Sequence, residues 1–281
     1  LSFVLFRFYQ HKKKIANELL EKNRLITDQK IQITNGIRYA SRIQNAILPS
    51  LDMVKQLLPE HFILFMPKDI VSGDFYWITQ RNNKVIVAVA DCTGHGVSGA
   101  FMSMLGISFL IQIVTIENTI ESDKILSRLK NYFNSALYPE GIKTEQKDGM
   151  EIAIAIIDPE DMIAEYSGAN SPLLMVRNGE IIEYEPNKTA IGTFKNDNGT
   201  FKRHFIDLKK NDALYFFSDG FISQFGGANG QMFMSKPFRQ LLINIHDKPA
   251  EEQKQILYKT HLEWRGNNEQ IDDILVLGIK I

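Results

Sequence analysis

Apolar residues recur every seven positions near the start of the chain. The recurring residues are Leu19, Ile26, Ile33, Ala40 and Ile47. They fall in a stretch, 12–48, that has no proline, a single glycine and abundant Glu, Lys, Gln and Asn. This spacing predicts a long helix that pairs with a second copy through a heptad seam. Asn23 and Lys30 fall where the second apolar row of a seam is expected. A solvated helix that packs on its own domain therefore remains an alternative.

Short apolar runs separated by turn residues replace this pattern after Pro49, which is expected to end the helix. The runs that predict strands are 62–66, 75–79, 85–90, 151–158, 162–167, 173–177, 180–183, 202–208, 213–218 and 274–281. Helical patterns cover 97–116, 125–137 and two segments between 235 and 264. The polar segments 81–84 and 178–179 predict tight hairpins, the second with an Asn-Gly turn. Strands in antiparallel groups favour an α+β sandwich over a doubly wound parallel sheet.

Composition narrows the class of protein. The chain of 281 residues is 44% hydrophobic, has a net charge of -1 and contains one cysteine, Cys92. A near-neutral charge gives no reason to expect a nucleic-acid partner. One cysteine excludes an intramolecular disulfide and a cysteine-based zinc cluster, and it fits a reducing compartment. A cytoplasmic domain is the expectation.

The first residues are apolar and aromatic and are followed by Lys12, Lys13 and Lys14. They resemble the end of a truncated transmembrane helix with its positive cytoplasmic flank, which would anchor the protein to an inner membrane. A disordered end is the alternative. We therefore expect three parts: a membrane-segment remnant at 1–10, a helical linker at 11–48 and one folded domain at 49–281.

Carboxylates stand at the ends of several apolar runs, next to small residues. They are Asp74, Asp91, Asp219, Asp272 and Asp273. A lone carboxylate at a strand end is usually solvated, but several converging ones repel unless a cation lies between them. Oxygen ligands favour magnesium or manganese over zinc. Two such ions held by carboxylates are suited to phosphoester hydrolysis.

Six motifs occur in a fixed order along the chain. They are VSGDFY at 71–76, AD at 90–91 with GHG at 94–96, DGM at 148–150, SGANSP at 167–172, FSDG at 217–220 and DD at 272–273. From about residue 47 to the end, the chain resembles SpoIIE-type serine/threonine phosphatases, the bacterial branch of the metal-dependent PPM (type 2C) family. The resemblance implies a β-sandwich flanked by helices, with two manganese or magnesium ions at one edge.

The resemblance also implies roles for individual residues. Asp74 and Asp91 would bind the first metal ion, and Asp91 would bridge both ions. Cys92 would contribute its backbone carbonyl. Asp219 would bind the second ion together with Asp272 or Asp273, which the sequence does not separate. A water between the ions would attack phosphoserine or phosphothreonine, so that Asp74 and Asp91 act in catalysis through the metals.

His95 lies four residues after Asp91. It is a candidate catalytic residue, and a hydrogen bond that stabilises the turn is the alternative. Lys68 is the nearest cation that could contact a phosphate. By family analogy the substrate would be a phosphorylated anti-sigma-factor antagonist or a similar switch protein. Residues 39–49 resemble the entry helix of such phosphatases, and our hypothesis is that twisting or pairing of this helix regulates the loops that carry Asp74 and Asp219.

Three other functions are alternatives for this sequence. A cysteine phosphatase needs an Arg six residues after its nucleophile, and Ser98 stands six residues after Cys92. Residues 94–99 fit the glycine pattern of a dinucleotide site, but Asp91 would repel a pyrophosphate and antiparallel strands precede the motif. A catalytically silent domain of the same fold remains the second candidate.

Overall fold

The computed structural model describes residues 2–137, 148–192 and 200–281. Contacts divide the chain into two compact units, Leu1–Ile43 and Gln44–Ile281. The first unit is formed by helix α1 (Ser2–Ile47), whose last residues belong to the second unit. The predicted long helix is thus present, and it exposes 57% of Leu19, 60% of Ile26 and 64% of Ile33.

The described part of the second unit contains two five-stranded sheets and one small hairpin. The first sheet has the order β1 (His61–Met66), β12 (Ile274–Lys280), β9 (Ala213–Phe217), β6 (Leu173–Arg177) and β7 (Glu180–Tyr184). The second has the order β2 (Phe75–Arg81), β3 (Lys84–Cys92), β4 (Met150–Asp158), β5 (Ile163–Ala169) and β8 (His204–Asp207). Every neighbouring pair of strands is antiparallel. The predicted α+β sandwich is confirmed.

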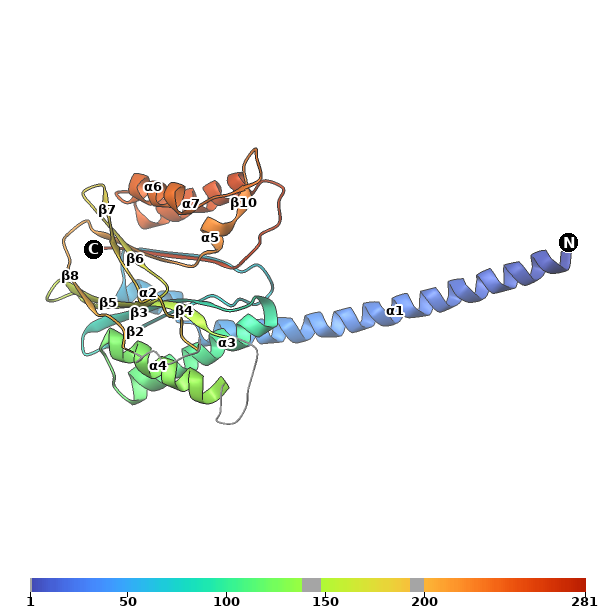
Figure 1. The fold of residues 1–281 in the computed structure, drawn as a ribbon, viewed down its shortest axis with the longest axis horizontal. Coiled ribbons are helices and arrows are strands. Elements are labelled where there is room, and N and C mark those ends of the chain that lie inside the picture. Colours follow the sequence, from blue (N-terminus) through green and yellow to red (C-terminus); the bar gives the residue numbers. More distant parts are fainter. Residues whose placement is uncertain (1, 138–147, 193–199) are drawn as a thin grey trace. The chain divides into compact units, whose positions relative to one another are not determined.

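Helices cover the outer face of each sheet (Figure 1). The second sheet is covered by α3 (Gly96–Leu110), the π-helix η1 (Ile111–Ile116) and α4 (Ser122–Leu137). The first is covered by α5 (Gly220–Ser223), α6 (Ser235–Ile245) and α7 (Ala250–Arg265). Strand β3 shows why the strand sequences are apolar throughout. Val87 faces the core between the sheets, whereas Ala88 faces the core under α3 and α4.

The predicted hairpin turns are present. Asn82 and Asn83 have φ of 49° and 62°, and Asn178 and Gly179 have φ of 52° and 78°. Two consecutive residues with positive φ match the twist of the strands they join. These turns set the registers of β2 with β3 and of β6 with β7.

Several elements differ from the sequence-based expectation. The pattern did not predict α2 (Leu51–Leu57), whose N-terminus is capped by the hydroxyl of Ser50, 3.3 Å from the backbone nitrogen of Met53. It also missed α5 and the small hairpin of β10 (Phe225–Gly226) and β11 (Gln231–Met232). The helix expected over 97–116 becomes a π-helix in its last turns. Among the described residues, only Gly96–Ile116 is a helix long and apolar enough to cross a membrane, and its packing against the second sheet identifies it as a core helix.

His261 on α7 is buried and provides a test of the packing beneath α5. It is 1% exposed, both ring nitrogens lack hydrogen-bond partners, and its ring lies 5.4 Å from that of Phe221. Burial, reinforced by Arg265, lowers the pKa of His261 to about 4. The folded state therefore excludes a proton that the unfolded chain takes up below a pH of about 6.5.

We expect His261 to destabilise the fold as the pH falls from about 6.5 to 4. In chemical denaturation, the free energy of unfolding of the wild type should decrease relative to that of His261→Leu, by on the order of 2–3 kcal/mol over this range. All other titratable groups contribute to both proteins, so their effects cancel when the unfolding free energy of one protein is subtracted from that of the other. Parallel pH profiles would contradict a neutral, buried His261.

Candidate active site

Acidic residues gather at one end of the core between the sheets. Tyr76, Val89, Ala153 and Leu275 belong to this core. Side chains along a strand alternate between faces, so residues two positions away point the same way. The residues two positions beyond these four, toward one end of the sandwich, are Asp74, Asp91, Glu151 and Asp273. The strand pattern therefore aims four carboxylates at the same end of the sandwich.

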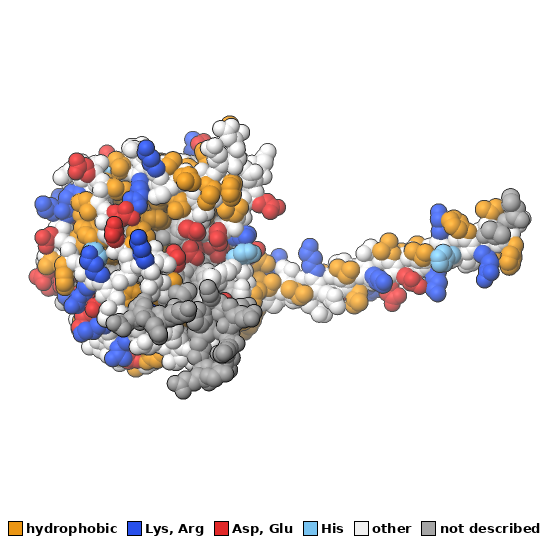
Figure 2. Space-filling view, viewed as in Figure 1, with side chains coloured by type: hydrophobic (Ala, Val, Ile, Leu, Met, Phe, Trp, Pro, Cys, Tyr) orange, Lys and Arg blue, Asp and Glu red, His pale blue; other side chains and the backbone are white. Residues whose placement is uncertain are grey.

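The carboxylates of this acidic cluster differ in how deeply they are buried. Asp74 and Asp273 are each 2% exposed. Asp91 and Asp272 are partly buried, while Asp219 and Glu151 are exposed. Figure 2 shows acidic side chains grouped on the face of the molecule seen there. The acidic cluster thus extends from two buried acids to acids that solvent reaches.

Asp74 carries the strongest electrostatic signal. Its Oδ2 atom is buried without a hydrogen-bond partner. Burial and then the neighbouring Asp91 raise the pKa of Asp74 well above its usual value, while a hydrogen bond from Ser218 acts in the opposite direction. A buried carboxylate oxygen with no donor, facing other carboxylates, has the chemistry of a cation ligand.

The other acids are coupled to Asp74 and to one another. Burial, followed by repulsion from Asp219 and Asp272, raises the pKa of Asp91 to about 7. Burial and Asp272 raise the pKa of Asp219. The structure therefore brings Asp74, Asp91, Asp219, Asp272 and Asp273 together, as the sequence predicted.

Glu151 is a member of this cluster that the sequence analysis missed. It lies opposite Asp91 in the register of β3 and β4, and its Oε1 accepts a hydrogen bond from Asn170 at 3.2 Å. Burial raises its pKa, and Asp219 adds to this effect. A single carboxylate in the otherwise apolar run 150–157 was the available signal.

Asp272 and Asp273 differ in what their oxygens contact. The two carboxylate oxygens of Asp273 accept hydrogen bonds from the backbone N–H groups of Lys68 and Gly73, each at 2.7 Å. Asp272 accepts one bond, from the backbone N–H of Asp273 at 2.9 Å. Asp273 is thus engaged in fixing the segment 68–73, whereas Asp272 retains an oxygen with no hydrogen-bond partner among the described residues.

Two glycines allow the backbone segments around the site to approach closely. A Cβ atom on Gly73 would lie 2.6 Å from the carbonyl oxygen of Gly94 and 3.2 Å from that of Cys92. A Cβ atom on Gly220 would collide with the carbonyl oxygen of Asp273. Only glycine fits at such approaches. The Cys92 carbonyl is therefore held beside the segment that leads into Asp74.

The Cys92 side chain is not suited to nucleophilic attack. It is 4% exposed, and burial followed by repulsion from Asp91 raises its pKa well above the usual value. A thiol that stays protonated is a poor nucleophile. This agrees with the sequence argument against a cysteine mechanism.

His95 lies in the turn before α3, paired with Asp69. Its Nδ1 is 2.9 Å from Oδ2 of Asp69, and the side chains are 53% and 46% exposed. Asp69 was not singled out by the sequence. The contact agrees with a turn-stabilising role for His95, and a catalytic role for this residue stays a prediction. The Lys68 side chain forms no ion pair within the described ranges.

The clustered carboxylates are the kind of ligand that divalent cations prefer, but their side chains are not arranged as a complete metal site. Within residues 2–137, 148–192 and 200–281, no three His, Cys, Asp or Glu side chains form a ready metal-binding group. The unpartnered oxygen of Asp74 and the mutual repulsion of the acids are nonetheless what a bound cation would relieve. The individual metal-ligand assignments therefore stay predictions.

Comparisons with known proteins show the family and the fold of this chain. The family model described as stage II sporulation protein E (SpoIIE) matches residues 81–281. The SiaA-PP2C domain of Pseudomonas aeruginosa is similar in structure, with a TM-score of 0.81 and 29% identity over 90% of this chain and 98% of that one. No curated protein matches the chain.

Two further structures share the fold. The PP2C phosphatase domain of SpoIIE from Bacillus subtilis, solved with a regulatory fragment, has a TM-score of 0.62 and 20% identity over 79% of this chain and 63% of that one. The RsbU and RsbW domains of Rv1364c from Mycobacterium tuberculosis match with a TM-score of 0.62 and 19% identity over 79% and 60%.

A cation site at Asp74 has a thermal signature. In excess chelator at pH 8, Asp74→Asn should melt at a higher temperature than the wild type, because it removes a buried charge that neighbouring acids repel. Manganese at about 100 times its Kd should raise the melting temperature of the wild type by roughly 5–10 °C and that of Asp74→Asn by far less. Differential scanning calorimetry measures both.

Asp161→Asn is the matched control, since Asp161 is exposed in the turn between β4 and β5. It should respond to manganese as the wild type does. A wild type whose melting is indifferent to both manganese and magnesium would count against a metal site.

Proposed function

Because this chain belongs to the SpoIIE family of phosphatase domains, we propose that it hydrolyses phosphoserine or phosphothreonine on a bacterial signalling protein, with two divalent manganese or magnesium ions. The buried, unpartnered oxygen of Asp74 among coupled carboxylates is the observation that carries this proposal. It provides a negative site that a cation completes at the end of the sandwich core.

The proposed roles follow the position of each group. Asp74, Asp91 and the Cys92 carbonyl would hold one ion, with Asp91 shared by both, and Asp219 and Asp272 would hold the other. Bound ions would activate a water and neutralise charge on the phosphoryl group. Before the ions bind, burial and then repulsion from Asp219 and Asp272 keep the pKa of Asp91 at about 7, so that a proton and a cation compete for the same carboxylate.

Asp272, rather than Asp273, is proposed as the acid that binds metal. The oxygens of Asp273 already accept the N–H groups of Lys68 and Gly73. Withdrawing them would leave two backbone donors unsatisfied, which costs about 1–3 kcal/mol each. Asp273 instead positions the segment that leads into Asp74.

His95 is proposed to hold a proton near the leaving group. Asp69 contacts Nδ1 and so fixes the ring orientation, which leaves Nε2 as the nitrogen that could exchange a proton with a substrate. The exposure of both side chains, 53% and 46%, supports access of a substrate protein to this pair.

The proposed substrate is a phosphorylated switch protein such as an anti-sigma-factor antagonist. Family membership and the RsbU and RsbW domains of a structural relative support this class. The apolar first residues and Lys12 to Lys14 support, from sequence alone, a cytoplasmic location next to an upstream membrane or sensor segment.

Activity should depend on metal and on the clustered acids. With manganese, the wild type should hydrolyse p-nitrophenyl phosphate and a phosphoserine peptide, and chelator should abolish both activities. Asp91→Asn and Asp219→Asn should lower kcat/KM by roughly 100-fold or more, because each removes a charge that balances the ions. Asp161→Asn should retain wild-type kinetics.

The outcome also separates the two candidate functions. Hydrolysis that survives chelation would contradict the metal mechanism. A wild type that binds manganese by calorimetry but hydrolyses neither substrate would support a catalytically silent signalling module.

The end of α1 offers a route for regulation. Gln44 is 5% exposed, and its side-chain amide donates to the backbone carbonyl of Ser72 at 2.6 Å and to the hydroxyl of Ser103 at 2.8 Å. Its carbonyl oxygen accepts the backbone N–H of Ser72 at 3.1 Å. Ser72 in turn caps the backbone N–H of Asp74 with its hydroxyl at 3.0 Å. One buried side chain thus connects the last turns of the helix to the segment that carries Asp74.

We propose that pairing of two copies through α1 regulates the site through the contacts of Gln44. The exposed heptad residues Leu19, Ile26 and Ile33 supply an apolar seam for a parallel homodimer. Sedimentation of the full chain and of a chain beginning at residue 44 would measure this directly.

Loss of the Gln44 contacts should weaken metal-dependent activity without unfolding the domain. Gln44→Ala leaves the backbone N–H of Ser72 without its side-chain partner and leaves the Ser72 carbonyl only the Ser103 hydroxyl at 3.2 Å, so the segment before Asp74 becomes less ordered. We expect the manganese concentration for half-maximal activity to rise by about threefold to tenfold, at unchanged circular dichroism. Arg42→Ala, which alters an exposed residue of the same helix, should have no such effect. Equal metal dependence in Gln44→Ala and wild type would refute the connection.

A further inference from the structure

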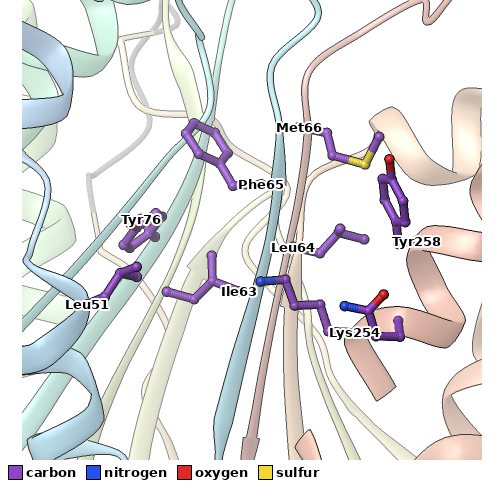
Figure 3. Close-up of a pocket in the computed structure, with 9 residues that line it drawn as sticks. Leu51, Ile63, Leu64, Phe65, Met66, Tyr76, Lys254 and Tyr258 are labelled. Atoms are coloured by element: carbon purple, nitrogen blue, oxygen red, sulfur yellow. The ribbon is translucent and has the colours of Figure 1, made fainter. Parts of the chain in front are cut away.

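A groove lies along the edge of the first sheet, and none of the clustered acids lines it. Strand β1 forms its floor, α2 and α7 form its sides, and its volume is about 410 Å³ (Figure 3). This is within the range of roughly 300–1,000 Å³ that is usual for ligand sites. Ile63, Phe65 and the 67%-exposed Leu51 give it an apolar lining.

The backbone of β1 is unpaired on the side of the groove. β1 is the outermost strand of its sheet and pairs only with β12. The backbone N–H of Lys280 donates to the carbonyl of Glu60 at 2.8 Å, which identifies these residues as a hydrogen-bonded pair. Pairs alternate along antiparallel strands, so Ile63 and Phe65 direct their N–H and C=O groups outward. No described residue bonds to these groups.

Three polar side chains around the groove, those of Tyr76, Lys254 and Tyr258, lack partners among the described residues, whereas Gln255 donates to Glu251. Tyr76 is 7% exposed, packs edge-on against Phe65 with 5.9 Å between ring centroids, and its hydroxyl has no hydrogen bond within the described ranges. Lys254, on α7, is the one charged residue among those that line the groove in the described structure, and it forms no ion pair there. The hydroxyl of the 41%-exposed Tyr258 is likewise available.

We propose that this edge docks an extended segment of a partner protein, which adds a strand to β1 and places a carboxylate against Lys254. An extended chain supplies both backbone donors and acceptors to the edge, and its alternate apolar side chains fill the lining beside Phe65. A carboxylate provides the counterion that Lys254 lacks. Pairing of β1 with β1 of a second copy is disfavoured, because it would bring two Lys254 side chains to the same edge.

The probe is a fluorescent peptide, Ser-Val-Glu-Ile-Thr-Val-Ser, titrated with the full chain and followed by anisotropy. We expect micromolar binding, at least tenfold weaker for Lys254→Glu and recovered when Lys replaces the Glu of the peptide. In amide exchange by NMR, the N–H groups of Ile63 and Phe65 should gain protection on binding, while those of Phe62 and Leu64 are protected already. Lys259→Glu, on the exposed face of α7, is the matched control and should bind as the wild type does.

Methylation of the peptide nitrogens separates strand addition from simple apolar contact. Two peptides are compared, one N-methylated at the odd-numbered residues and one at the even-numbered residues. Only one of them should bind, since only one of these two sets of N–H groups faces the edge of β1. The proposal would be overturned if neither the Glu peptide nor the Lys peptide bound its matching protein at 1 mM. It would also be overturned if Lys254→Glu bound the Glu peptide as tightly as the wild type does. Self-association of Lys254→Ala without peptide binding by the wild type would overturn it too, because Lys254 would then only protect an edge strand.

Discussion

Repulsion among carboxylates at the end of the sandwich core is the constraint on which the site depends. One oxygen of the buried Asp74 lacks a partner, and burial, followed by Asp91, Asp273 and Asp272, raises the pKa of this residue. Asp91 lies in β3, and Asp74, Asp219, Asp272 and Asp273 lie within two residues of the ends of β2, β9 and β12, so strands of both sheets hold the acids close together. A site built in this way is incomplete without positive charge. Burial of the apolar cores on both sides of each sheet offsets the free-energy cost of bringing the acids together.

Backbone contacts hold the segments around this charge in place. Asp273 accepts two N–H groups from the segment 68–73, and Gly73 allows that segment to lie against Gly94. The side-chain amide of Gln44 bonds to both backbone groups of Ser72 in the same segment. The segment is thus fixed by a carboxylate, by a close backbone approach and by an amide. Each of these three contacts acts on the main chain, so the position of Asp74 depends little on the identity of surface side chains.

Much of this organisation was readable from the sequence, and the limits have physical causes. The positions of most strands along the chain, and the clustering of the acids, followed from apolar runs with Asp74, Asp91 and Asp219 at their ends. The orientation of Asp272 relative to Asp273 did not, because both faces of β12 are covered and its apolar run has no visible alternation. Glu151 becomes meaningful only through the register that sets it opposite Asp91. α2 has seven residues, too few for a helical period to show.

The strict alternation of β3 has an evolutionary consequence. Val85, Val87 and Val89 face one core, and Ile86, Ala88 and Ala90 face the other. Losing or gaining one codon between Lys84 and Asp91 would exchange the two faces of the strand and turn Asp91 away from Asp74. Residues in this strand can be replaced by residues of similar size, but the number of residues in the strand cannot change. Related sequences should accordingly show insertions and deletions in the loops, and an invariant spacing between the hairpin turn at Asn82 and Asn83 and the carboxylate that follows it.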